Sequence, residues 1–137
     1  MSTKSIESLV RLLRIAKQKT QELSLRISDL ETACASAVTS LEWLEQAVLS
    51  EERQKDVNYA DLARYMEGAS AKQRGLQATY KTLRDESEAA KSELAEAFSE
   101  MKKLEHLISV ARKADKRHRG KKAEAETNEL AIARRAS

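Results

Sequence analysis

Small and apolar side chains recur along this chain at alternating steps of three and four residues, in two long series. A repeat of this kind gives a helix one narrow apolar stripe, which is buried when the helix winds against a similar stripe. The pattern is therefore typical of a coiled coil. The first series, which we name seam one, comprises Ile6, Leu9, Leu13, Ala16, Thr20, Leu23, Ile27, Leu30, Cys34, Ala37, Leu41, Leu44 and Val48.

The second series, seam two, has the same spacing and is interrupted by Gln73 and Ser87. It begins out of phase with seam one, and the residues that would continue seam one are the polar Glu51, Lys55 and Asn58. One continuous helix would lose its apolar stripe at these residues, so we expect the chain to turn back on itself. Seam two comprises Leu62, Met66, Ala69, Gln73, Leu76, Tyr80, Leu83, Ser87, Ala90, Leu94, Ala97, Met101, Leu104, Ile108 and Ala111.

The predicted fold is all-α: a long antiparallel two-helix coiled-coil hairpin with a C-terminal helical overhang, forming a single domain over residues 1–137. We expect helix one over about 3–50, a turn over about 50–58 and helix two over about 59–133. Asn58 followed by Asp61 resembles a helix-capping sequence, which places the start of the second helix near Tyr59.

The alternation of large and small residues along the two seams suggests how they pair. Placing Leu41 opposite Ala69 lets the helices approach closely without voids. In this register Leu30 faces Tyr80, and residues beyond about Ala111 have no partner. Because the two seams complete each other within one chain, we expect a monomer when no partner is bound.

The composition argues against a globular core. Aromatic residues make up 4% of the chain, charged residues make up 34%, and proline is absent, which suits a long helical hairpin. No run of about 18 apolar residues is present, so we expect no membrane span. The N-terminal segment does not resemble a signal peptide, so the expected location is the cytoplasm. Cys34 is interpreted as an apolar core residue rather than a reactive thiol.

The net charge of +3 originates at the C-terminal end, where residues 112–137 carry nine basic and four acidic side chains. We call this segment, residues 112–137, the basic overhang. Its first part is densely basic, with Asp115 as the acidic residue among seven cations. An unpaired basic helix suits an acidic or polar partner surface. We name the group the tail cations: Arg112, Lys113, Lys116, Arg117, Arg119, Lys121 and Lys122.

The sequence lacks the patterns that carry catalysis. It contains no glycine-rich phosphate loop, no Cys-x-x-Cys pair, no His-Glu-x-x-His motif and no nucleophile elbow. His106 and His118 lie too far apart along one helix to converge on a metal or substrate. We therefore expect no enzymatic activity, no cofactor, no metal and no small-molecule substrate, and a function that depends on binding.

Four aromatic residues fall outside the seam positions: Trp43, Tyr59, Tyr65 and Phe98. Such rings can cover the edges of the seams, or they can contact a partner. The sequence gives the two alternatives equal weight.

Three stretches together resemble the FliJ family of flagellar export proteins, which are small coiled-coil hairpins of the type III export apparatus. The first is SLVRLLRIAKQKTQELSLRISDLE, with arginines among leucines ahead of a run of heptads. The second, after the turn, is YADLARYMEGASAKQRGLQATYKTLRDE. The third is LAEAFSEMKKLEHLISVARKADKRHRGKKAEAETNELAIARR, in which a Glu-rich helix passes into a basic segment. The likeness covers nearly the whole chain.

The resemblance implies a stalk associated with the export ATPase, located at the cytoplasmic face of the membrane at the flagellar base. Family members engage the hexameric ATPase with the end that carries both termini, contact the export gate membrane protein, and bind export substrate chaperones. The tail cations are the expected ATPase-binding residues. The positions that match the gate contact of the family, the gate set, are Leu44, Leu62, Met66, Ala69 and Gln73.

Two other classes of function remain open. The tail cations can bind nucleic acid, but no aromatic residue alternates with them to stack on bases, so no nucleic acid is expected. A generic coiled-coil adaptor or the stalk of a virulence type III secretion system would have the same composition.

Overall fold

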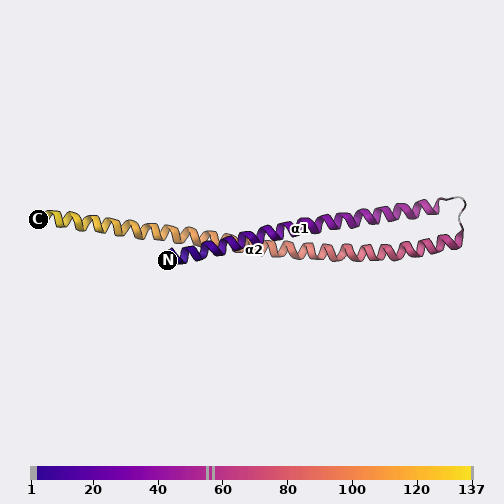
Figure 1. Cartoon of the computed structure of the whole chain (residues 1–137), viewed down its shortest axis with the longest axis horizontal. Coiled ribbons are helices and arrows are strands. Elements are labelled where there is room, and N and C mark those ends of the chain that lie inside the picture. The colour runs from indigo at the N-terminus through magenta and orange to yellow at the C-terminus, as the bar shows by residue number, and fades with distance from the viewer. Residues whose placement is uncertain (1–2, 55, 57, 137) are drawn as a thin grey trace. The chain divides into compact units, whose positions relative to one another are not determined.

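The structure is a computed structural model that describes residues 3–54, 56 and 58–136. Its described residues form two helices, α1 (Thr3–Glu52) and α2 (Tyr59–Ala136), and contain no strand (Figure 1). The fold is all-α, and the prediction of a helical hairpin with antiparallel helices is confirmed.

The chain divides into two compact units, each with one segment from either helix. Unit 1 comprises Met1–Gln21 and Ala95–Ser137, and unit 2 comprises Glu22–Leu94. Unit 2 contains the connection between the helices. The expectation of a single domain over the whole chain stays a prediction.

Helix α1 ends by tightening its last turn. The Arg53 N–H donates to the Leu49 carbonyl at 3.2 Å, and the Gln54 N–H donates to the Glu51 carbonyl, three residues back, at 3.3 Å. These bonds satisfy carbonyls that a helix end would otherwise leave unpaired. No described residue has a positive φ, so the described part of the connection uses no left-handed residue. Lys55, one of the predicted turn residues, lies outside the described residues.

Helix α2 begins where its cap was predicted. The Asn58 side-chain oxygen accepts a hydrogen bond from the Ala60 N–H at 2.9 Å, and the Asn58 carbonyl accepts one from the Leu62 N–H at 2.9 Å. The side chain thereby satisfies one of the unpaired N–H groups of the first turn. Asp61 in that turn places a negative charge near the positive end of the helix dipole.

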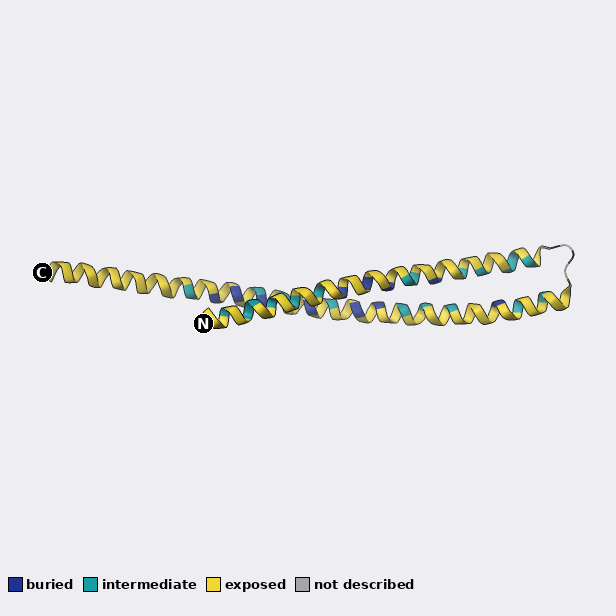
Figure 2. Ribbon diagram, viewed as in Figure 1, coloured by how far each residue is buried: buried dark blue, intermediate teal, exposed yellow. Residues whose placement is uncertain are grey.

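Both predicted seams are the least exposed stripes of their helices. Every residue of seam one is buried or half-buried, and so is every residue of seam two except Gln73, which is exposed (Figure 2). The heptad pattern therefore identified the faces that pack. In the described residues no buried side-chain nitrogen or oxygen lacks a hydrogen-bond partner, so the buried polar Ser87 carries no unsatisfied-group penalty.

The core of unit 2 is a cluster of Ile27, Leu30 and Ala90, against which Leu83 and Leu94 pack. Ile27 and Leu30 are each 9% exposed, and Ala90 is 3% exposed. The small Ala90 opposite two large side chains allows close approach of the helices, as the large-against-small argument anticipated.

The register differs from the predicted one by about one heptad, because Ile27 clusters with Ala90, whereas the predicted register places Ala90 opposite Thr20, seven residues earlier. In the predicted register Glu31 would lie opposite Thr79, about 18 Å along the helix from Lys91. The structure instead joins the Glu31 carboxylate and the Lys91 ammonium at 3.0 Å, and Leu30 clusters with Ala90 rather than facing Tyr80. Both registers bring the same heptad positions together, so the sequence pattern could not separate them.

The corrected register extends the paired part of unit 1 toward the C-terminus. Leu104, Ile108 and Ala111 are buried there, with Ile108 5% and Ala111 3% exposed. Arg112 lies beside the first turns of α1, in a hollow that Ile6 also lines. Pairing of the helices in unit 1 therefore continues to Ala111 and its neighbour, and the overhang begins after them.

Candidate partner-binding surfaces

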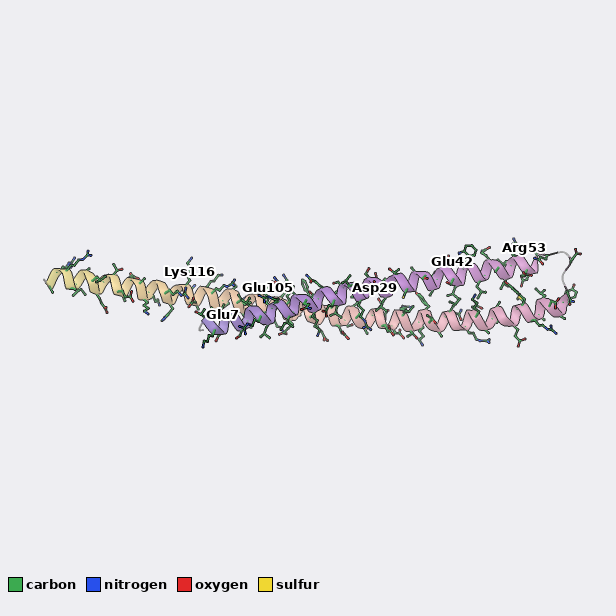
Figure 3. All side chains as sticks on the ribbon, viewed as in Figure 1. Glu7, Asp29, Glu42, Arg53, Glu105 and Lys116 are labelled. Carbon is green, nitrogen blue, oxygen red and sulfur yellow. The ribbon has the colours of Figure 1, made fainter. Side chains whose placement is uncertain are left out.

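The C-terminal segment of α2 presents every side chain to solvent. All residues from Lys116 to Ala136 are exposed (Figures 2 and 3). Most helical stability in proteins comes from packing of an apolar face, and these exposed residues have no such packing. This exposed segment of unit 1 is therefore a candidate partner-binding surface.

Most tail cations are exposed, on this segment or just before it. Lys113, Lys116, Arg117, Lys121 and Lys122 are all exposed. Arg119 differs, since its Nε lies 3.2 Å from the Asp115 carboxylate one turn earlier. This contact partly neutralises Arg119.

Arg112 corrects the prediction that all tail cations lie beyond the last paired residue. Its side chain shares a shallow hollow with residues from the first turns of α1. Arg11 and Arg14 line the same hollow, so three arginines from two helices contribute to its lining, together with the acidic Glu7. We name Arg11, Arg14 and Arg112 the arginine cluster.

The chemistry of the arginine cluster suits carboxylate partners. An arginine side chain stays charged in proteins and offers a planar fork of donors that matches a carboxylate with two hydrogen bonds. Ile6 and Val10 add apolar residues to the lining of the hollow. Sequence reasoning did not assign Arg11 and Arg14 to a site, because their proximity to Arg112 follows from the register and not from a motif.

All five residues of the gate set lie in unit 2, and four of them line one hollow. Leu44, Met66, Ala69 and Gln73 line one hollow between the helices. Other lining residues include Leu41, Val48 and Glu45. Leu62 is half-buried and is not among the lining residues, and Ala69 is 8% exposed. A partner at this hollow would reach Gln73 and the edges of Leu44 and Met66 before it reached Ala69.

The four aromatic residues outside the seams differ in how far they are exposed, which bears on whether they cover a seam edge or face a partner. Trp43 and Tyr59 are 75% and 85% exposed, so neither covers a seam. Tyr65 and Phe98 are 37% and 49% exposed, and the Lys102 ammonium lies 5.3 Å from the centre of the Phe98 ring. This distance allows a cation–π contact, which holds Phe98 against its own helix.

The described residues contain no group of three or more His, Cys, Asp or Glu residues placed to hold a metal ion. None of their helices has a segment apolar enough to cross a bilayer. His106 and His118 are both exposed, and Cys34 is half-buried on seam one.

Comparisons with models of protein families, with curated proteins and with solved structures find no match for this chain. The surfaces of the two units and the resemblance carried by the three stretches of sequence are therefore the indications of function.

Proposed function

We propose that the protein is a non-enzymatic component of the bacterial flagellar type III export apparatus, a coiled-coil stalk and chaperone that engages the export ATPase ring and the export gate. The observation that carries the proposal is the end of unit 1. An exposed basic helix continues there from a hollow that three arginines help to line. Such an end favours contact with an acidic or polar ring.

The two basic features would contribute in different ways. The exposed tail cations create a long-range positive field, which accelerates encounter with an acidic surface. The arginine cluster supplies short-range recognition, because each guanidinium can hold a carboxylate in a defined orientation. Together they account for both steps of binding at one end of the protein.

The second contact in this proposal is the export gate, reached through the hollow in unit 2 that holds most of the gate set. Trp43, with most of its ring exposed, also belongs to unit 2 and is a suitable anchor for a partner. Binding of export substrate chaperones, and a location at the cytoplasmic face of the membrane at the flagellar base, follow from the family resemblance.

The alternative of nucleic-acid binding is favoured by one observation, the density of exposed cations after Ala111. Against it, the arginine cluster and tail cations have no exposed aromatic residue among them for base stacking. An adaptor of another coiled-coil assembly, or the stalk of a virulence secretion system, would need the same binding end and a different ring.

The direct test is binding of the purified export ATPase to the full chain. One variant carries Lys113→Ser, Lys116→Ser and Lys122→Ser, and a second carries Arg11→Ser and Arg14→Ser. Exposed charge contacts contribute about 0.2–1 kcal/mol each, so the triple variant should bind about tenfold more weakly. Raising the salt concentration should mimic this loss, because exposed charges are screened within about 10 Å at 0.1 M.

The matched control carries Lys72→Ser, Arg74→Ser and Lys81→Ser, three exposed cations of unit 2. It should retain wild-type binding and stimulation of ATP hydrolysis. Equal binding by wild type, tail variant and cluster variant would refute the proposal. Loss of DNA retention without loss of ATPase binding would favour the nucleic-acid alternative.

A further inference from the structure

A second stripe of residues runs along α2 in unit 1, beside seam two. Its members follow each other at alternating steps of four and three residues, so they share one face of the helix. All of them are exposed, and Leu107 and Val110 at its middle are 46% and 50% exposed. We name it the α2 stripe: Glu96, Glu100, Lys103, Leu107, Val110, Ala114, Arg117 and Lys121.

The α2 stripe is self-complementary when it is reversed about the midpoint between Leu107 and Val110. A second copy of the stripe, running antiparallel, places Glu96 opposite Lys121 of the partner copy and Glu100 opposite its Arg117. Leu107 then faces Val110 of the other copy. Two-fold symmetry repeats each contact, so one helix pair carries four opposite-charge pairs around an apolar centre.

Charges at the two ends of the stripe are available for such contacts. Within the described residues the ion pairs involve other side chains, and none engages Glu96, Glu100, Arg117 or Lys121. The stripe is acidic at its N-terminal end and basic at its C-terminal end. An antiparallel copy therefore places opposite charges together, while a parallel copy would place like charges together.

Helix α1 adds apolar surface beside the acidic end of the α2 stripe. Leu12 and Ile15 are 51% and 63% exposed, and they line a shallow hollow together with Glu96 and Glu100. Burial of such exposed apolar side chains against a second copy is favourable, because each gains free energy by leaving water.

We propose that the α2 stripe is the contact surface of a reversible antiparallel dimer of this chain. The partner is a second copy because its reversed stripe places Lys121 and Arg117 opposite Glu96 and Glu100. Among the charged residues of the stripe, Lys103 faces the uncharged Ala114. The apolar centre is small, so the buried area falls in the class of weak, transient interfaces. The chain is then monomeric at low concentration and dimeric at high concentration.

The dimer would cover Arg117 and Lys121, which are also tail cations. Self-association would then compete with binding of an acidic partner at the same end. This consequence rests on the proposed function, whereas the dimer itself does not. For this reason the variants that test ATPase binding, at Lys113, Lys116 and Lys122, lie off the stripe.

The test is sedimentation velocity of the full chain from about 5 to 500 μM, in buffer of low ionic strength. The variants are Glu96→Lys, Lys121→Glu and the double charge swap. Each single reversal turns two attractive contacts into two repulsive ones, so the dimer dissociation constant should rise at least about fivefold. The double swap restores opposite charges and should return the dissociation constant to within about twofold of the wild type.

Controls carry the same changes of net charge off the stripe, as Glu126→Lys and Lys113→Glu, and should dimerise like the wild type. A variant with Leu107→Ser and Val110→Ser should stay monomeric over the same range, with unchanged helical circular dichroism because both positions are exposed. A wild type that stays monomeric at all concentrations would overturn the proposal. A dimer whose dissociation constant does not change with the single reversals would also overturn it. The same holds for a dimer that the double swap fails to restore, because the two copies would then associate through other contacts.

Discussion

Replacing Leu30 with Asp tests whether the cluster of Ile27, Leu30 and Ala90 holds unit 2 together. Leu30 is 9% exposed, so the change forfeits about 1.5–3 kcal/mol of apolar burial. It also places a carboxylate against Ile27 and Ala90, which costs about 1–3 kcal/mol more. The free energy of unfolding should fall by about 3–6 kcal/mol.

The assay is thermal unfolding followed by helical circular dichroism. For a chain of this size a loss of about 3 kcal/mol lowers the Tm by at least about 10 °C. The matched control is Leu25→Asp on the same helix, at a site that is 67% exposed. This control should change stability by no more than about 0.5 kcal/mol. A Leu30→Asp variant that melts with the wild type, or a control that melts with the variant, would show that this cluster is not the core.

Three smaller changes test the ends and edges of the helices. Asn58→Ala should lower the free energy of unfolding in urea by about 1 kcal/mol, because it removes the cap of α2. Asn58→Gly should lower it by only a few tenths of a kcal/mol. Equal losses would mean that the side-chain hydrogen bond to Ala60 contributes nothing. Gly68→Ala and Gly75→Ala should each stabilise by up to about 1 kcal/mol, because a Cβ at either glycine meets nothing within 4 Å; a lower Tm would contradict the open space there. Lys91→Ala should cost about 0.2–1 kcal/mol by breaking the pair with Glu31, and the difference from wild type should vanish in 1 M salt.

The heptad pattern was sufficient to predict the helices and their buried faces. Thr3–Glu52 and Tyr59–Ala136 are close to the expected ranges because the apolar stripes, the polar interruption and the Asn58 cap all act locally. The register was predicted wrongly by a heptad. Any shift by seven residues keeps the same classes of position in contact, and the choice depends on side-chain packing such as Ile27 against Ala90.

The candidate sites likewise divide into features that local sequence determines and features that depend on the register of the two helices. Exposure of Lys116 and the cations after it required only that seam two ends near Ala111, so it could be predicted from sequence. Arg11 and Arg14 beside Arg112 could not, since their proximity depends on the register. The gate set was carried over from a resemblance, and Leu62 lies outside the hollow that its other members line.

The most direct measurement of the proposed function is made in the organism that encodes this chain. Deleting its coding sequence should abolish motility and filament assembly, and the wild-type sequence supplied in trans should restore both. The variant with Lys113→Ser, Lys116→Ser and Lys122→Ser should restore motility only partly, while the matched unit 2 control should restore it fully. A deletion strain that swims normally and carries filaments of normal number and length would contradict a role in flagellar export.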